Sequence, residues 1–131
     1  MQRISLVLGL LCASFVASAQ EPWIYRDNPN WEPSWNKRAF PRAGACFFKD
    51  PGFQGDRFCV RKGDKLDRLP GSFGDNISSI QLFGNARVAV FNDRHFSGGS
   101  QQIRRSVADL RPERFRGGHT WNDRISSLVV R

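Results

Sequence analysis

From Gly44 onward, short runs of apolar and β-branched residues alternate with polar turn clusters. The apolar runs cover residues 45–48, 57–60, 77–83, 88–91, 102–103 and 125–130, and the turn clusters include Asp50-Pro51-Gly52, Lys62-Gly63-Asp64, Pro70-Gly71 and Gly98-Gly99. Many short strands joined by glycine-rich turns are typical of an all-β sandwich or barrel. No window of helical length keeps a 3.6-residue period, and we expect at most one helical turn around residues 106–111.

Two blocks of this pattern occur twice along the chain. Phe48, Phe53 and Gly55 recur as Phe91, Phe96 and Gly98, each 43 residues later. Asp75, Ile77, Ser78 and Ser79 recur as Asp123, Ile125, Ser126 and Ser127, each 48 residues later, so the second copy contains a five-residue insertion. A unit of about 45 residues cannot bury a core alone, whereas two copies packed face to face can. We therefore expect one domain over residues 44–131, with one motif at 44–84 and a second at 85–131.

The N-terminus has the features of a secretory signal peptide. A basic Met1-Gln2-Arg3 is followed by an apolar run at residues 4–16 and by Ala17-Ser18-Ala19, the small-x-small pattern of a cleavage site. We expect cleavage after Ala19. A membrane anchor is the competing interpretation, but the run is shorter than the roughly 20 residues that a spanning helix needs. A lipid anchor at Cys12 would require a small residue in place of Leu11.

Residues 20–43 have a different composition from the rest of the chain. They contain four prolines and three tryptophans, Trp23, Trp31 and Trp35, together with Tyr25. Proline at this density opposes regular helices and interior strands, so we expect an irregular N-terminal arm. Its aromatic side chains either dock on the domain itself or form a contact patch for a partner.

Charge and cysteine content indicate whether the chain forms a disulfide and which class of partner it binds. The formal net charge of +8 becomes +7 when residues 1–19 are removed, and two cysteines remain, Cys46 and Cys59. In a secreted or periplasmic protein such a pair predicts a disulfide, with two buried free thiols as the alternative. The positive charge favours acidic partners, although in many exported proteins such charge is simply a solvated surface. Export argues against genomic nucleic acid, and no further stretch is long and apolar enough to span a membrane.

The repeated blocks have a physical explanation. The spacing aromatic-x4-aromatic-x-Gly fits a strand that folds back sharply, with two aromatic rings packed across the fold and a glycine where the backbone needs positive φ. The last serine of each second block, Ser79 or Ser127, is placed to bond the folded hairpin's backbone and close the motif.

These two blocks, present twice and in order, resemble the βγ-crystallin family, in its microbial form of a single domain with two Greek-key motifs. The resemblance covers residues 44–131 and implies a double Greek-key β-sandwich. In that family the second block reads N/D-N/D-x-x-S/T-S and binds Ca²⁺. Asn122-Asp123-Arg124-Ile125-Ser126-Ser127 matches it fully, whereas the first copy begins with Gly74 in place of an Asn or Asp.

The resemblance implies two calcium sites. Asp123 and Ser126 would supply side-chain oxygens and Arg124 a carbonyl, following Asn122 at the start of the motif. Asp75, Asn76 and Ser78 would do the same in the first copy. Few carboxylates and nearby arginines predict weak binding, with a dissociation constant of about 10⁻⁶ to 10⁻³ M. The alternative is that Asn122 and Asp75 only shape turns.

Three functions follow from these observations, none of them catalytic. The first is a secreted calcium-binding domain with a structural or surface-interaction role. The second is an inhibitor of an extracellular metalloproteinase, because Cys46 and Cys59 flank the first hairpin and the chain is, more loosely, similar to secreted bacterial inhibitors with this fold. The third is a polyanion or envelope-surface binder that uses the insertion arginines Arg104, Arg105, Arg111, Arg114 and Arg116 together with the tryptophan arm. The chain has two histidines, neither in a metal-ligand spacing, and no nucleophile or phosphate-loop motif.

Overall fold

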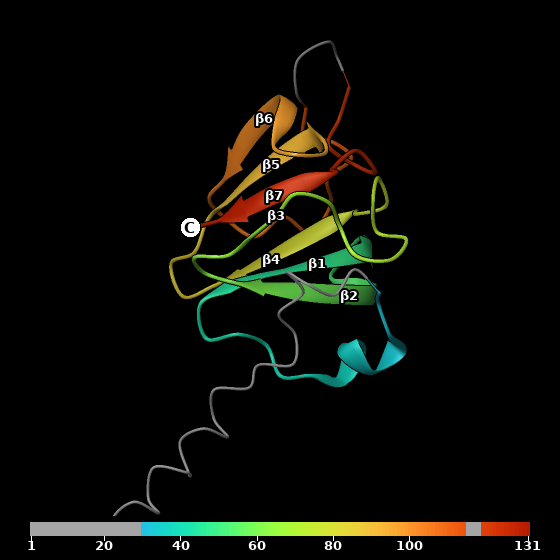
Figure 1. The fold of residues 1–131 in the computed structure, drawn as a ribbon, viewed down its shortest axis with the longest axis vertical. Coiled ribbons are helices and arrows are strands. Elements are labelled where there is room, and N and C mark those ends of the chain that lie inside the picture. Colours follow the sequence, from blue (N-terminus) through green and yellow to red (C-terminus); the bar gives the residue numbers. More distant parts are fainter. Residues whose placement is uncertain (1–29, 115–118) are drawn as a thin grey trace, which may run out of the picture.

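Two antiparallel β-sheets form the body of the protein in the computed structural model, which describes residues 30–114 and 119–131 (Figure 1). The strands are β1 (Gly44–Asp50), β2 (Gln54–Arg61), β3 (Lys65–Leu66), β4 (Ser79–Phe83), β5 (Val88–Asp93), β6 (Ser97–Ile103) and β7 (Ser127–Val130). The first sheet has the order β2-β1-β4 and the second β3-β7-β5-β6. The predicted all-β sandwich is therefore confirmed.

Each half of the chain contributes one segment to the sheet of the other half. Strand β3 belongs to the first half but pairs with β7 of the second, placing Leu66 opposite Leu128. In return Val107 of the second half bridges to Ile80 in β4 of the first. This exchange is the double Greek-key arrangement, and it makes the two halves one folding unit.

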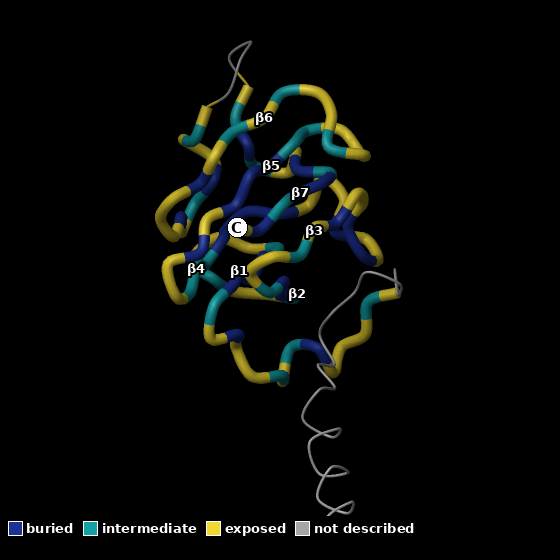
Figure 2. Tube along the Cα trace, turned by 60° about the vertical axis from the view of Figure 1, so that its left-hand side comes forward, coloured by how far each residue is buried: buried dark blue, intermediate teal, exposed yellow. Residues whose placement is uncertain are grey.

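The buried residues of the core come from strands of both sheets and from the loops that join them (Figure 2). The largest fully buried side chains are Trp121, Phe47, Phe58, Phe73, Ile77, Ile80, Leu110, Ile125 and Leu128. They come from both halves in nearly equal number, so the repeat distributes apolar side chains evenly across the interface. Apolar area removed from water at such positions supplies most of the stabilisation, at roughly 25 cal/mol per Å².

The strands differ in extent from the hydrophobic runs. Strand β6 begins at Ser97, well before the predicted run at residues 102–103, because pairing with β5 satisfies its glycine-rich backbone. Strand β3 has only two residues and no detectable alternation. Residues 106–111 form no helix; their backbone instead bridges to β4 through Val107.

The described part of the arm, residues 30–43, contains a 3-10 helix, η2 (Pro33–Lys37). Proline at its first turn explains how a helix forms in a segment that we expected to be irregular, since that position needs no N–H donor. Trp35 is 2% exposed, and the Trp31 indole donates a hydrogen bond of 2.8 Å to the carbonyl of Arg57. These two tryptophans thus pack on the chain's own first sheet.

Other predictions for the N-terminus fall on residues that the structure does not describe. The signal peptide at residues 1–19, together with Trp23 and Tyr25 of the arm, lies outside the described residues. Among the residues that are described, no helix has the length and apolar character needed to cross a membrane.

Candidate functional site

Each half of the sandwich contains one sharply folded hairpin. In the first, the rings of Phe48 and Phe53 meet edge to face at 5.9 Å, and in the second those of Phe91 and Phe96 do the same at 5.9 Å. Phe53 and Phe96 have φ of 59° and 58°, a strained conformation for a bulky side chain. The repeated strain shows that the surrounding contacts, and not local preference, determine the fold of both hairpins.

The glycines of the motif allow the hairpins to fold closely. Gly55 and Gly98 have φ of 82° and 80°. A Cβ atom at Gly55 would lie 2.6 Å from the Asp50 carboxylate, and one at Gly98 would lie 2.5 Å from that of Asp93. Glycine suits both positions, because it adopts positive φ without strain and leaves room for the acidic side chain at the hairpin tip.

A serine from the second block closes each hairpin. The Ser79 hydroxyl donates to the carbonyl of Asp50 at 2.7 Å and accepts from the N–H of Phe53 at 3.1 Å. The Ser127 hydroxyl donates to the carbonyl of Asp93 at 2.6 Å and accepts from the N–H of Phe96 at 2.9 Å. One side chain in each half thus satisfies a donor and an acceptor that strand pairing leaves free.

The proposed calcium-binding side chains meet across the two halves, and not within one half. The Ser126 hydroxyl donates to Asp75 at 2.9 Å, and the Ser78 hydroxyl lies 3.5 Å from Asp123. The backbone supports this crossing, because the Asp75 N–H donates to Ile125 and the Asp123 N–H to Ile77, at 3.0 and 2.9 Å. Two equivalent corners result, each with a serine from one half and an aspartate from the other.

The remaining predicted ligands differ in how they are placed. The amide oxygen of Asn122 is buried without a hydrogen-bond partner, while its nitrogen donates to Asp123 at 3.1 Å. The Asn76 amide donates to the carbonyl of Ser72 at 2.7 Å, so its side chain stabilises a turn. The Arg124 N–H donates to the carbonyl of Trp121. In the described part of the chain no three His, Cys, Asp or Glu residues gather into a metal cluster.

Cys46 and Cys59 form a disulfide, as predicted from the sequence, and they are directly opposed in the β1–β2 ladder. A buried arginine that the sequence analysis missed lies beside it. The Arg57 guanidinium is 3.2 Å from the Cys59 sulfur and donates to the carbonyls of Asn36 and Arg38, at 2.9 and 2.6 Å. Arg57 therefore fastens the arm over the disulfide. Its position inside an apolar run was the available signal, since buried arginines are rare unless bonded.

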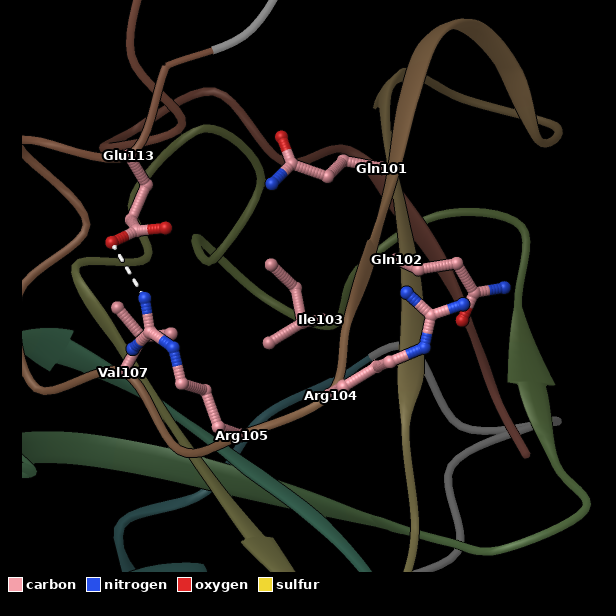
Figure 3. A pocket seen from close by; sticks show the side chains of 7 residues that line it. All are labelled: Gln101, Gln102, Ile103, Arg104, Arg105, Val107 and Glu113. Carbon is pink, nitrogen blue, oxygen red and sulfur yellow. Dashed lines mark hydrogen bonds and ion pairs between the residues drawn. The ribbon is translucent and has the colours of Figure 1, made fainter.

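The second half has a pocket of about 260 Å³ at the end of β6 (Figure 3). Ile103 and Val107 provide apolar lining, and an ion pair of 3.3 Å between Arg105 and Glu113 stands at one side. The pocket is lined by Gln101, Gln102, Ile103, Arg104, Arg105, Val107 and Glu113. It therefore combines a small apolar surface with a partly neutralised cationic rim.

A second ion pair occupies the insertion. The Arg111 guanidinium donates to both carboxylate oxygens of Asp109, with a shortest distance of 2.7 Å. These hydrogen bonds lower the pKa of Asp109 from 3.8 to about 2. Two of the five insertion arginines are thus engaged with acids, and Arg116 lies outside the described residues.

The chain matches a known protein family in sequence and known βγ-crystallin domains in fold. The model of peptidase inhibitor family I36 matches residues 38–103. A search of curated proteins found no match. Among solved structures, a protein from a study of the evolution of the eye lens βγ-crystallin domain fold is 27% identical, with a TM-score of 0.57, covering 72% of this chain and 91% of its own.

Two microbial domains show the same architecture. A βγ-crystallin domain from Flavobacterium johnsoniae is 21% identical with a TM-score of 0.55, covering 66% of this chain and 92% of its own. The βγ-crystallin domain of Abundant Perithecial Protein from Neurospora crassa, in its Ca²⁺-bound form, is 20% identical with a TM-score of 0.55, covering 71% and 92%. At this identity the two likenesses concern the fold alone.

Proposed function

The chain belongs to peptidase inhibitor family I36, and we propose that it is an exported inhibitor of an extracellular peptidase that acts by binding and not by catalysis. The observation that carries the proposal is the family match, which extends from Arg38 in the arm through the whole first half to the end of β6. The looser resemblance of the cysteine-flanked first hairpin to that of secreted bacterial metalloproteinase inhibitors makes a metallopeptidase the target that we expect.

The construction of the first half supports this proposal. An inhibitor binds tightly and resists cleavage when its contact surface is already rigid, because less conformational entropy is lost on binding. The first hairpin is held by the Cys46–Cys59 disulfide, by Ser79, and by a bond of 2.7 Å from the Gly52 N–H to the carbonyl of Ala108 in the other half. Such bracing is what a peptidase-facing surface requires.

The test is a titration of the protein against one metallopeptidase, one serine peptidase and one cysteine peptidase. We expect loss of metallopeptidase activity at near-stoichiometric protein, with the inhibitor intact by mass spectrometry. Added stoichiometric zinc should not restore activity, which separates binding from removal of the enzyme's metal. The reduced and alkylated protein is the control and should be degraded. Full activity of all three enzymes at a large molar excess would contradict the proposal.

We further propose that the two crossed corners bind calcium and stabilise the sandwich. Calcium prefers carboxylate, carbonyl and hydroxyl oxygens. Each corner offers a serine hydroxyl and an aspartate carboxylate from opposite halves, and the unpartnered buried oxygen of Asn122 adjoins the Asp123 corner. The residues therefore fit a weakly held hard cation. The related Neurospora crassa domain exists in a Ca²⁺-bound form. A bound ion would join the two halves through Asp75 and Ser126, and through Asp123 and Ser78.

Thermal unfolding with calcium and with chelator tests this second proposal. For the affinity expected here, 1 mM Ca²⁺ stabilises the folded state by about 0.4 to 4 kcal/mol. Ser126→Ala should reduce the rise in Tm, whereas Ser100→Ala, at an exposed position of β6, should leave it unchanged. An identical Tm in calcium and chelator would contradict calcium binding. It would not affect the proposal of peptidase inhibition.

A further inference from the structure

The strand register brings six cationic residues to one end of the sandwich. In the first sheet Gly44 pairs with Arg61, and the Lys62 N–H donates to the carbonyl of Ala43 at 2.9 Å, next to Arg42. In the second sheet the N–H groups of Arg87 and Arg131 each donate to the other's carbonyl at 2.8 Å. Val88 pairs with Ile103, immediately before Arg104.

One backbone bond joins these two sets. The Gly63 N–H donates to the carbonyl of Val130 at 2.8 Å, so the last residues of β2 and β7 lie at the same end (Figure 1, left, beside the label C). We call this end the cationic end. It comprises Arg42, Arg61, Lys62, Arg87, Arg104 and Arg131. Asp64, which is half-buried, is the one acidic residue among the described residues of these turns.

The opposite end, which contains the hairpin tips and the crossed corners, is nearly balanced in charge. Its acidic residues are Asp50, Asp67, Asp75, Asp93 and Asp123, and its basic residues are Lys49, Arg68, Arg94 and Arg124. The chain's excess of positive charge is therefore concentrated at the cationic end. A one-signed surface of this kind attracts polyanions over roughly a Debye length, about 8 Å at physiological salt.

Of the insertion arginines, which the sequence suggested for this role, Arg104 belongs to the cationic end, whereas Arg105 and Arg111 are less suitable. Arg105 pairs with Glu113 at 3.3 Å, and Arg111 pairs with Asp109 at 2.7 Å. Within residues 30–114 and 119–131, the ion pairs found do not involve Arg42, Lys62 or Arg87. These exposed side chains are available to an anion in solution.

The cationic end also has a groove of about 450 Å³, lined by residues 39–43, Arg61 and Lys62. One wall is firm, because Phe40 stacks on Phe83 with ring centroids 5.1 Å apart and the Arg57 guanidinium covers Phe40 at 4.4 Å. Phe40 is still 50% exposed, which makes it the one large apolar side chain exposed among the described residues. The groove is therefore a fixed concave surface with cationic and apolar walls.

We propose that the cationic end binds an acidic polysaccharide, with one segment of the chain lying in this groove. Charge complementarity selects a polyanion, and Arg side chains pair bidentately with carboxylate, sulfate or phosphate groups. The concave shape selects a single flexible chain over a flat anionic membrane. The binding surface is separate from the crossed corners. An exported inhibitor would thereby be held in an acidic cell-envelope or extracellular matrix, near the peptidases that it meets.

The test compares two triple variants that change the net charge equally. The first is Arg42→Gln, Lys62→Gln and Arg87→Gln at the cationic end, and the control is Lys49→Gln, Arg68→Gln and Arg94→Gln at the opposite end. Binding to a defined heparin oligosaccharide is measured over a salt series in the presence of chelator. We expect a loss of roughly 10- to 100-fold for the first variant at physiological salt, with a shallower salt slope, and about threefold or less for the control. Equal losses, or no binding by the parent protein, would overturn the proposal.

A second experiment tests the groove and the identity of the occupant. Ala39→Trp fills the groove without changing charge, and Ala39 is exposed, so the fold should persist by circular dichroism. We expect weaker oligosaccharide binding and unchanged binding to vesicles that contain anionic phospholipid. Tighter binding of the parent protein to those vesicles than to the oligosaccharide would contradict a polysaccharide occupant. Unchanged oligosaccharide binding by Ala39→Trp would overturn the role of the groove.

Discussion

In the first half of the sandwich Cys46 and Cys59 face each other across β1 and β2 and are joined by a disulfide; at the same register of the second half, Ala89 faces Gln102. The frame around them is otherwise the same. Each hairpin has an edge-to-face pair of rings at 5.9 Å and a serine that bonds the same two backbone groups. The fold of each hairpin thus depends on its ring pair and its serine. The disulfide beside the first hairpin is not needed for the same fold in the second.

A second difference lies deeper in the core. In the first half the rings of Phe58 and Phe73 meet at 4.9 Å. The equivalent residues of the second half are Gln101 and Trp121, and the indole donates to the Gln101 amide oxygen at 2.7 Å. One position pair is therefore satisfied by apolar packing and its counterpart by a hydrogen bond. Equivalent positions of the two halves can therefore be joined either by a contact between two aromatic rings or by a hydrogen bond between an indole and an amide.

Removal of the disulfide should have the largest effect on this comparison. We expect Cys46→Ala combined with Cys59→Ala to lower the free energy of unfolding by about 2–5 kcal/mol, because the unfolded chain gains freedom. Urea denaturation of the oxidised parent and the variant measures it. As the matched design, Ala89→Cys with Gln102→Cys should form a second disulfide, since the two positions face each other. A loss below about 1 kcal/mol in the first variant would contradict the role assigned to the bond.

Changing the second-half core pair should have the next largest effect. Trp121→Phe removes buried volume and leaves the Gln101 oxygen without its indole donor, so we expect a loss of about 2–3 kcal/mol. Adding Gln101→Phe recreates the Phe58–Phe73 pair of the first half and should recover part of that loss. A double-mutant cycle from chemical denaturation measures the coupling. Strictly additive losses would show that the two position pairs are not interchangeable.

The hairpin serines should give smaller and nearly equal effects. Ser79→Ala and Ser127→Ala each leave one backbone donor and one acceptor without the hydroxyl, which costs about 1–2 kcal/mol. Hydrogen exchange should show local opening of the hairpin in each variant. Opening should be greater in Ser127→Ala, because only the first hairpin has the Cys46–Cys59 bond behind it. Greater opening in Ser79→Ala would reverse our account of the two halves.

The smallest effect concerns the insertion, which only the second half contains. The hydrogen bonds from Arg111 lower the pKa of Asp109 from 3.8 to about 2. Because the folded pKa is the lower one, the interaction stabilises fully above pH 3.8 and is lost as pH falls toward 2. Asp109→Asn should lower Tm slightly near neutral pH, and this loss should shrink as pH falls through the acidic window, which flattens the pH dependence of Tm there. A change of equal size at pH 7 and pH 3 would contradict the assignment.

The fold could be predicted because its determinants repeat in the sequence. The recurrence of Phe48, Phe53 and Gly55 at an offset of 43 residues indicates a duplicated hairpin before any coordinates are known. The disulfide was predictable because only Cys46 and Cys59 remain once residues 1–19 are set aside, and because the compartment expected for the chain is oxidising. Strand β3 was not predictable, because two residues carry no alternation and it forms through its pairing with β7.

The side-chain partners were harder to predict, because they depend on how the two halves face each other. Sequence order associates Asp123 with Ser126, whereas the sandwich places Asp75 beside Ser126. Likewise nothing in the local sequence pairs Gln101 with Trp121, 20 residues apart. A repeat specifies two similar units, but their relative rotation is set by packing across the interface, and contacts between the halves follow from that rotation.

The arm has a consequence for any shortened form of this protein. Strand β2 is the outer strand of its sheet, and Trp31 and Asn36 occupy the carbonyl and the N–H of Arg57 on its open side. A chain truncated to begin at Gly44 would leave those groups bare. Exposed strand edges recruit strands from neighbouring molecules. The truncated domain should therefore self-associate, so residues 30–43 belong in any attempt to produce it as a monomer.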